Sequence, residues 1–244
     1  MAETARDPRP GVVQDRLFSK SLTAGATVIR WLLLSLVFSI IIEWAGMVLW
    51  WQDQGVEHSR TMLANELGYL DQDFRRSIVT SDPAKFAKRF ADNSYHYLFE
   101  VTRVVDFIHW VSPPPTTTDE GVRSSLHKIY ASVAEFVIAM MQVTQVFSVR
   151  LAILTLATPI FLLFSLVALV DGLVQRDLRR WGGGRESSFI YHYAKKAALP
   201  LVVLSWVIYL ALPISLHPTF VILPFATLFA LTVAITASTF KKYL

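Results

Sequence analysis

Residues 197–240 decide the fold, and they read AALPLVVLSWVIYLALPISLHPTFVILPFATLFALTVAITASTF. This 44-residue stretch contains no Asp, Glu, Lys or Arg. About 20 apolar residues suffice to cross the roughly 30 Å hydrocarbon core of a bilayer. The stretch must therefore fold back on itself, and His217 and Pro218 lie at the natural point of reversal. We predict one membrane span at 197–216 and another at 219–240.

Two further segments, 31–51 and 151–174, are long and apolar enough to cross a bilayer as helices. Glu43 is the only charged residue of the first segment, and Asp171 lies near the end of the second. No small-residue cleavage site follows the first segment, so we interpret it as an uncleaved signal anchor. The sequence predicts an all-α polytopic membrane protein with four transmembrane helices.

Segment 131–149 is a fifth apolar candidate, but its polar residues share one helical face. That arrangement is typical of an amphipathic helix and not of a lipid-facing span. Glu135, Gln142 and Gln145 share this face with Lys128 and Ser132. A fifth span would also place the most basic loop of the chain on the outside, so we keep four spans.

The distribution of basic residues predicts the orientation, because Lys and Arg accumulate in cytoplasmic segments. Residues 1–30 contain five Lys or Arg, loop 175–196 contains six, and tail 241–244 contains two. Residues 52–146 contain nine basic and twelve acidic residues. With four spans, all three basic segments are cytoplasmic and residues 52–146 form a domain outside.

The outside domain reads as helical. Asp82 is a good N-cap and Pro83 a good first helical residue, so a helix should begin there. Two apolar stripes with helical spacing lie before and after this point, and Pro113 to Pro115 end the second. The stripes are Leu63, Leu67, Leu70, Phe74 and Ile78, and then Tyr97, Val101, Val104, Val105, Ile108 and Val111. The last helix is expected to run unbroken from about Gly121 into span 151–174.

The sequence lacks the common catalytic and nucleotide-binding signatures. There is no HExxH, GxSxG or Walker motif, and there is no cysteine. The one glycine-rich loop, formed by Gly182, Gly183 and Gly184, continues with Arg185 where a phosphate-binding loop needs Gly-Lys-Ser/Thr. We interpret these glycines as a hinge. The six histidines show no metal-ligand spacing, so we expect no metal and no cofactor.

Two features are candidate functional sites. Glu43 is an acid inside a span, where an ionised carboxylate is costly. It could hydrogen-bond within the bundle or to a partner helix, reach the outer interface, or take part in ion or proton translocation. Arg176, Arg179, Arg180 and Arg185, with Trp181, could act as topology signals, contact anionic lipid, or bind a partner; these residues are the candidate partner or lipid contact.

Residues 171–192, which read DGLVQRDLRRWGGGRESSFIYH, resemble the integrating conjugative element membrane protein family. The arrangement of the spans is similar too. The resemblance implies a bacterial inner-membrane protein with residues 52–146 in the periplasm, encoded among genes for a conjugative type IV secretion apparatus, often near its coupling ATPase. It implies no reaction, so no catalytic residue is carried over.

Together these patterns predict a non-enzymatic inner-membrane accessory component of conjugative DNA transfer that acts through protein–protein contacts. We expect partners among the other proteins of the apparatus, with the coupling ATPase as one candidate, and no direct nucleic-acid binding; a homo-oligomer stays open. The alternatives are a small membrane transporter that uses Glu43 and a membrane-embedded enzyme that acts on lipid or cell wall.

Overall fold

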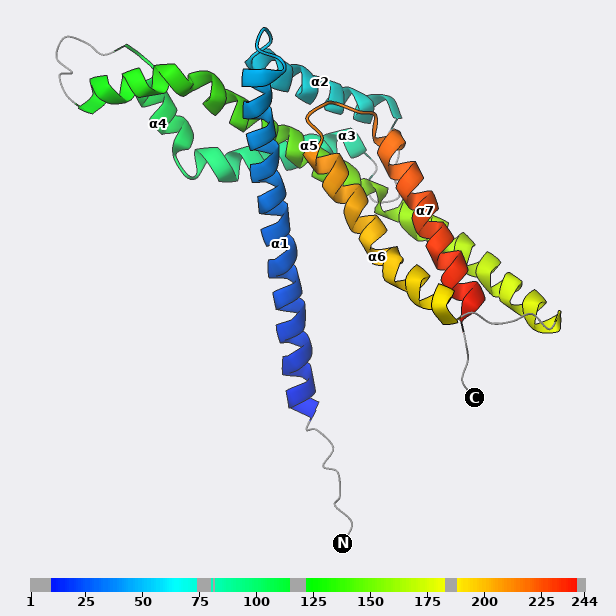
Figure 1. Cartoon of the computed structure of the whole chain (residues 1–244). Helices are drawn as coiled ribbons and strands as arrows, with labels where there is room; N and C mark the ends of the chain where they lie inside the picture. Colours follow the sequence, from blue (N-terminus) through cyan, green and yellow to red (C-terminus); the bar gives the residue numbers. More distant parts are fainter. Residues whose placement is uncertain (1–9, 74–79, 81, 115–121, 183–187, 241–244) are drawn as a thin grey trace.

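The computed structural model describes residues 10–73, 80, 82–114, 122–182 and 188–240 (Figure 1). Within these ranges every regular element is a helix. Four helical segments are long and apolar enough to cross a membrane: Ala26–Leu49, Ser125–Trp181, Phe189–Ala211 and Pro218–Thr239. The prediction of an all-α fold with four spans is therefore confirmed, and the chain is a multi-pass membrane protein.

The described elements are all helical and follow one another in chain order. They are α1 (Pro10–Leu49), α2 (Val56–Asp73), α3 (Pro83–Tyr95), the π-helical turn η1 (His96–Glu100), α4 (Val104–Val111), α5 (Val122–Trp181), α6 (Ser188–Ala211) and α7 (Pro218–Thr239).

Helix α5 is the axis of the molecule. It has 60 residues and is therefore about 90 Å long at 1.5 Å per residue. Its N-terminal part extends past α1, and its C-terminal part runs beside α6 and α7 (Figure 1). The expectation of one unbroken helix from about residue 121 into the second span is confirmed. We call the end of the bundle at which α2, α3 and α4 lie the α2 end, and the opposite end the Trp181 end.

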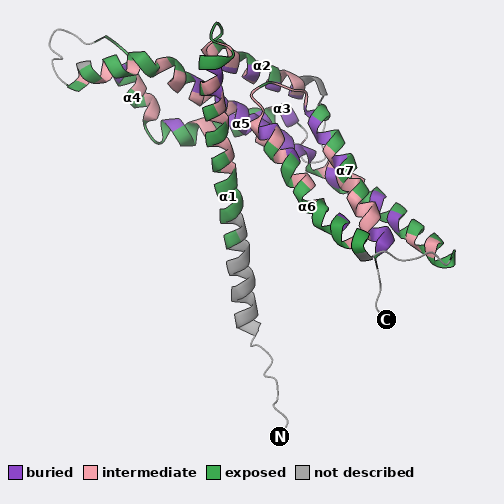
Figure 2. Cartoon of the chain, in the orientation of Figure 1, coloured by how far each residue is buried: buried purple, intermediate pink, exposed green. Residues whose placement is uncertain are grey.

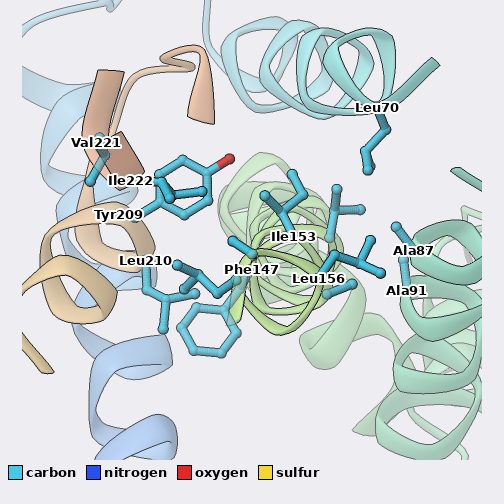
Figure 3. Close-up of a cluster of buried hydrophobic side chains, with 14 of the residues drawn as sticks. Leu70, Ala87, Ala91, Phe147, Ile153, Leu156, Tyr209, Leu210, Val221 and Ile222 are labelled. Carbon is cyan, nitrogen blue, oxygen red and sulfur yellow. The ribbon is translucent and has the colours of Figure 1, made fainter. Parts of the chain in front are cut away.

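The hydrophobic core surrounds the middle of α5. Figure 3 shows Ile153 and Leu156 of α5 between Ala87 of α3 on one side and Tyr209 of α6 on the other. All of these residues belong to one buried cluster, which also includes Leu70 of α2. Helices α2 and α3 of the predicted outside domain therefore pack directly against residues of the predicted span 151–174.

The outward faces of the spanning helices carry exposed apolar side chains. Figure 2 shows exposed residues along α1 and the outer side of α6, whereas buried residues concentrate where α2 and α3 meet α5. Leu33 and Val37 of α1 and Val203 of α6 are about half exposed. A helix that shows apolar residues to its surroundings suits lipid as the solvent.

Close helix contact at the Trp181 end depends on a small residue in α5. A Cβ atom added to Gly172 would lie 2.5 Å from the Ala234 carbonyl oxygen of α7 and 2.7 Å from the Ala237 Cβ. Membrane helices commonly approach one another through such small residues, because van der Waals packing drives their association. Gly172 therefore fixes how near α5 and α7 lie.

The structure describes some of the residues behind the predicted helix start and the two apolar stripes of the outside domain. Asp82 Oδ1 accepts a hydrogen bond from the Lys85 N–H at 3.1 Å, and Pro83 begins α3, so the predicted start of this helix is confirmed. Phe74 and Ile78 of the first stripe lie outside the described residues. The second stripe is divided, because Arg103 adopts a left-handed backbone conformation with φ of 58° between η1 and α4.

Candidate functional site: a buried ion-pair network and an exposed basic helix end

Arg150 of α5 is buried at the α2 end, with 1% of its surface exposed. Its Nε donates a hydrogen bond to Glu66 Oε1 of α2 at 2.8 Å, and its Nη2 lies 2.8 Å from the same oxygen. A charge removed from water is costly unless it is paired and hydrogen-bonded. The Arg150–Glu66 pair meets that requirement and links α2 to α5.

The rest of the Arg150 guanidinium binds the end of α6 and the turn that follows it. Nη1 donates to the carbonyl oxygens of Leu212 at 2.5 Å and Tyr209 at 3.3 Å, and Nη2 donates to that of Ile214 at 2.8 Å. The last carbonyls of a helix have no partner within the helix. Arg150 supplies that partner, and its positive charge suits the negative C-terminal end of the helix dipole.

Glu66 is also fully buried, and both of its oxygens are hydrogen-bonded. The Tyr209 hydroxyl donates to Oε2 at 2.9 Å, and the Ser215 hydroxyl donates to Oε1 at 3.3 Å. The network of Glu66, Arg150, Tyr209 and Ser215 therefore joins α2, α5, α6 and the α6–α7 connection. With both charges enclosed and paired, the arrangement is suited to fixing helices relative to one another.

Glu43 of α1 lies at the same end of the bundle and is 1% exposed. Its Oε1 is 3.0 Å from His58 Nδ1 of α2. The His58 ring stacks on Trp51 at a centroid distance of 4.1 Å, and the Trp51 indole covers Gly46, where any Cβ would collide with it. Within the described residues, Glu43 Oε2 has no hydrogen-bond partner. The structure thus places Glu43 in a contact inside the bundle. Its partner, His58, belongs to α2 and lies outside the spans.

A second contact fixes α1 against α5 nearby. The Trp44 Nε1 donates to the Phe136 carbonyl oxygen at 2.9 Å, and the two rings meet edge to face with centroids 6.1 Å apart. Helix α1 is therefore attached to the bundle mainly at the α2 end, as Figure 1 also shows.

The predicted basic contact residues lie at the other end of α5. Arg176 and Arg179 are half-buried, whereas Arg180 is exposed and Trp181 is 92% exposed. Arg176 lies 6.0 Å from the centre of the Phe240 ring of the chain's C-terminal region. The residues nearest this end therefore present a tryptophan and a guanidinium outward.

The predicted hinge begins where α5 ends. The Gly182 N–H donates to the Leu178 carbonyl oxygen at 3.0 Å, which closes the last helical turn. Gly183, Gly184 and Arg185 lie outside the described residues. Arg150 and Trp181 are 31 positions apart on one helix, or about 45 Å along its axis. The buried network and the exposed basic end are thus separate sites on the same helix, α5.

Sequence reasoning missed the buried network. Arg150 directly precedes the apolar run that begins at Leu151, and Glu66 interrupts the stripe of Leu63, Leu67 and Leu70. Each is a charged residue within an apolar pattern. That combination is the feature of the sequence that could have indicated a buried ion pair. Which two charges meet depends on the packing of α2 on α5, and that contact has no local mark in the sequence.

Comparison with known proteins identifies the family. A family model described as "IncC plasmid conjugative DNA transfer protein DtrJ-like" matches residues 50–241. The matched region includes Glu66, Arg150 and the basic end of α5, whereas Glu43 precedes it. No curated protein and no solved structure matches the chain significantly. The match agrees with the resemblance to conjugative-element membrane proteins. The chain therefore belongs to the DtrJ-like family of conjugative DNA transfer proteins.

Proposed function

We propose that the protein is a non-enzymatic, inner-membrane accessory component of a conjugative type IV secretion apparatus, acting through protein–protein contacts. Family membership supports a role in DNA transfer. The observation that carries the contact role is the exposed end of α5, where Trp181 is 92% exposed beside the exposed Arg180. Charge asymmetry along the chain favours a cytoplasmic position for this end.

The chemistry of the α5 end suits a protein partner. Trp and Arg are enriched among residues that dominate the energy of interfaces. Tryptophan supplies a large apolar contact, and the guanidinium groups of Arg179 and Arg180 can form paired hydrogen bonds with carboxylates. An acidic cytoplasmic surface on another protein of the apparatus fits this end, and the coupling ATPase is one candidate.

Two contacts contribute to this role by fixing the position of α5 in the bundle. Arg150 fixes α5 to α2 and to the α6–α7 connection, and Gly172 fixes it against α7. A partner bound at Trp181 would therefore be held at a defined position relative to α2, α3 and α4. In this proposal the chain connects components on the two sides of the membrane.

Pull-down from a mild detergent tests the proposal. Arg179→Gln with Arg180→Gln should reduce recovery of apparatus proteins while membrane abundance stays normal, because the loop keeps four other basic residues. The matched control is Lys195→Gln with Lys196→Gln, which removes the same charge from exposed positions at the start of α6. Added salt should weaken the wild-type association, since exposed charge pairs are screened.

Equal recovery of apparatus proteins with Arg179→Gln/Arg180→Gln and with Lys195→Gln/Lys196→Gln would contradict partner docking at this end. The arginines would then act as topology signals. Recovery of an untagged second copy with the tagged chain would instead point to a homo-oligomer.

One observation supports the transporter alternative: Glu43 Oε2 is buried without a hydrogen-bond partner among the described residues. Its partner on the other oxygen, His58, comes from α2 and not from a span. A transport pathway would require further polar groups from the spans facing Glu43. Uptake of ions by vesicles that contain the purified chain, abolished by Glu43→Gln, would favour this alternative over the contact role.

A further inference from the structure

Residues 96–111, which form η1 and α4, expose large apolar side chains although they lie outside all four spans. Five of these side chains are between 43% and 67% exposed: Tyr97, Leu98, Val101, Phe107 and Trp110. Large exposed apolar patches mark surfaces that meet another apolar phase or a protein. The segment therefore has a surface that the described chain does not cover.

The helix that leads into this segment lies beside the spans and not above them. Ala87 and Ala91 of α3 share one buried cluster with Leu156 of α5 and with Tyr209 of α6 (Figure 3). Tyr209 and Leu156 both lie in segments that qualify as membrane spans. In Figure 1, η1 and α4 continue from α3 on the side of α5 toward which α1 and α6 extend. Residues 96–111 thus flank the spans at the α2 end.

The C-terminal carbonyls of α4 have hydrogen-bond partners, as a water-poor site requires. The Ser112 N–H donates to the Ile108 carbonyl oxygen at 2.9 Å. Two side chains from α5 reach the terminal carbonyls: Arg123 Nη2 donates to that of Trp110 at 3.3 Å, and His127 Nδ1 lies 2.9 Å from that of Val111. Unsatisfied backbone groups cost several kcal/mol in lipid, so these contacts suit immersion at the interface.

The side chains match a headgroup boundary. Tyr97 and Trp110 have an apolar ring and a polar atom, the combination that is enriched at membrane interfaces. Lys88 and Arg89 of α3 and Arg103, between η1 and α4, are exposed and basic. Long basic side chains can lay their stems on an apolar surface and extend their charges to phosphate.

We propose that residues 96–111 lie in the boundary between headgroups and acyl chains of the bilayer leaflet at the α2 end, with phospholipid covering their apolar face. Exposed apolar residues of α1, such as Val37 and Ile41, also require lipid, and α1 extends on the same side of α5 as this segment (Figure 1). The segment then acts as an interfacial anchor in the sense of a monotopic helix.

Spin-label accessibility in phospholipid vesicles tests the proposal directly. The chain contains no cysteine, so single-cysteine variants need no background removal. Labels at Val101→Cys and Phe107→Cys probe the segment. Val37→Cys on the exposed face of α1 serves as the lipid control, and Arg60→Cys, on the exposed part of α2, serves as the water control.

The proposal predicts that labels at 101 and 107 collide with oxygen more than with a water-soluble nickel chelate, in a ratio several-fold above that at 60 and below that at 37, which lies at the middle of the first span. A ratio equal to that at 60 would place the segment in water and overturn the proposal. Low accessibility to both reagents at 101 and 107 would also overturn it, because a second copy of the chain would then cover the patch.

Discussion

Replacing Arg150 with Met should destabilise the protein strongly. Methionine can follow the aliphatic stem of arginine as far as Nε, so the change removes the guanidinium with its charge and hydrogen bonds and keeps the packing of the stem. The Glu66 carboxylate would remain buried with only hydroxyl donors, and the carbonyls of Leu212 and Ile214 would lose their partner. Removing one member of a buried ion pair costs about 3–5 kcal/mol, so we expect a loss of that size.

Reversible unfolding of the purified chain in dodecyl maltoside titrated with SDS would measure this loss. Arg60→Met is the matched control, because Arg60 and Glu57 form an ion pair at 2.9 Å with 63% and 62% of their side chains exposed. Exposed pairs contribute about 0.2–1 kcal/mol. The same substitution should therefore be mild at position 60 and severe at position 150.

A loss for Arg150→Met within about 1 kcal/mol of that for Arg60→Met would refute the reasoning, since it would put the buried pair in the range of exposed ones. Combining Arg150→Met with Glu66→Leu gives a further test. The double variant should lose less than the two single losses added together, because no unpaired charge is left in the core.

Three other predictions concern Glu43, Gly172 and the orientation of the chain. Glu43→Gln should preserve membrane abundance better than Glu43→Leu, because Gln still offers an acceptor to the imidazole of α2; equal loss of DNA transfer at normal abundance would favour an ionisable role. Gly172→Leu should force α5 away from Ala234 and lower the unfolding free energy by about 1–3 kcal/mol; wild-type stability would contradict the contact. Phosphatase fusions should be active after Asp92 and inactive after Gly184, and activity after Gly184 would disprove the predicted orientation.

Much of the fold could be predicted from the sequence because bilayer dimensions constrain apolar segments so strongly. The uncharged 197–240 stretch required two helices and a reversal, and α6 and α7 meet at that reversal. The start of α3 was equally clear, because Asp82 and Pro83 act through local hydrogen bonding and a fixed φ angle. Both features depend on residues close together in the chain.

The rest depends on contacts between distant residues. The Arg150–Glu66 pair spans 84 positions of the chain, and neither residue has a local pattern that names its partner. The amphipathic stripe between Tyr97 and Val111 did not reveal the break at Arg103, because its left-handed backbone is not encoded by glycine. The packing of α2 and α3 against a spanning part of α5 was also not foreseen, because apolar periodicity shows that a face is buried but not against which helix.

A role of the exposed basic end of α5 in conjugative DNA transfer is tested most directly by the transfer frequency of donor cells that lack the chain and are complemented with variants. Donors complemented with the wild-type chain or with Lys195→Gln and Lys196→Gln should transfer DNA at equal frequency. Donors complemented with Arg179→Gln and Arg180→Gln should transfer far less at the same membrane abundance. Equal transfer by all three complemented strains would contradict this role.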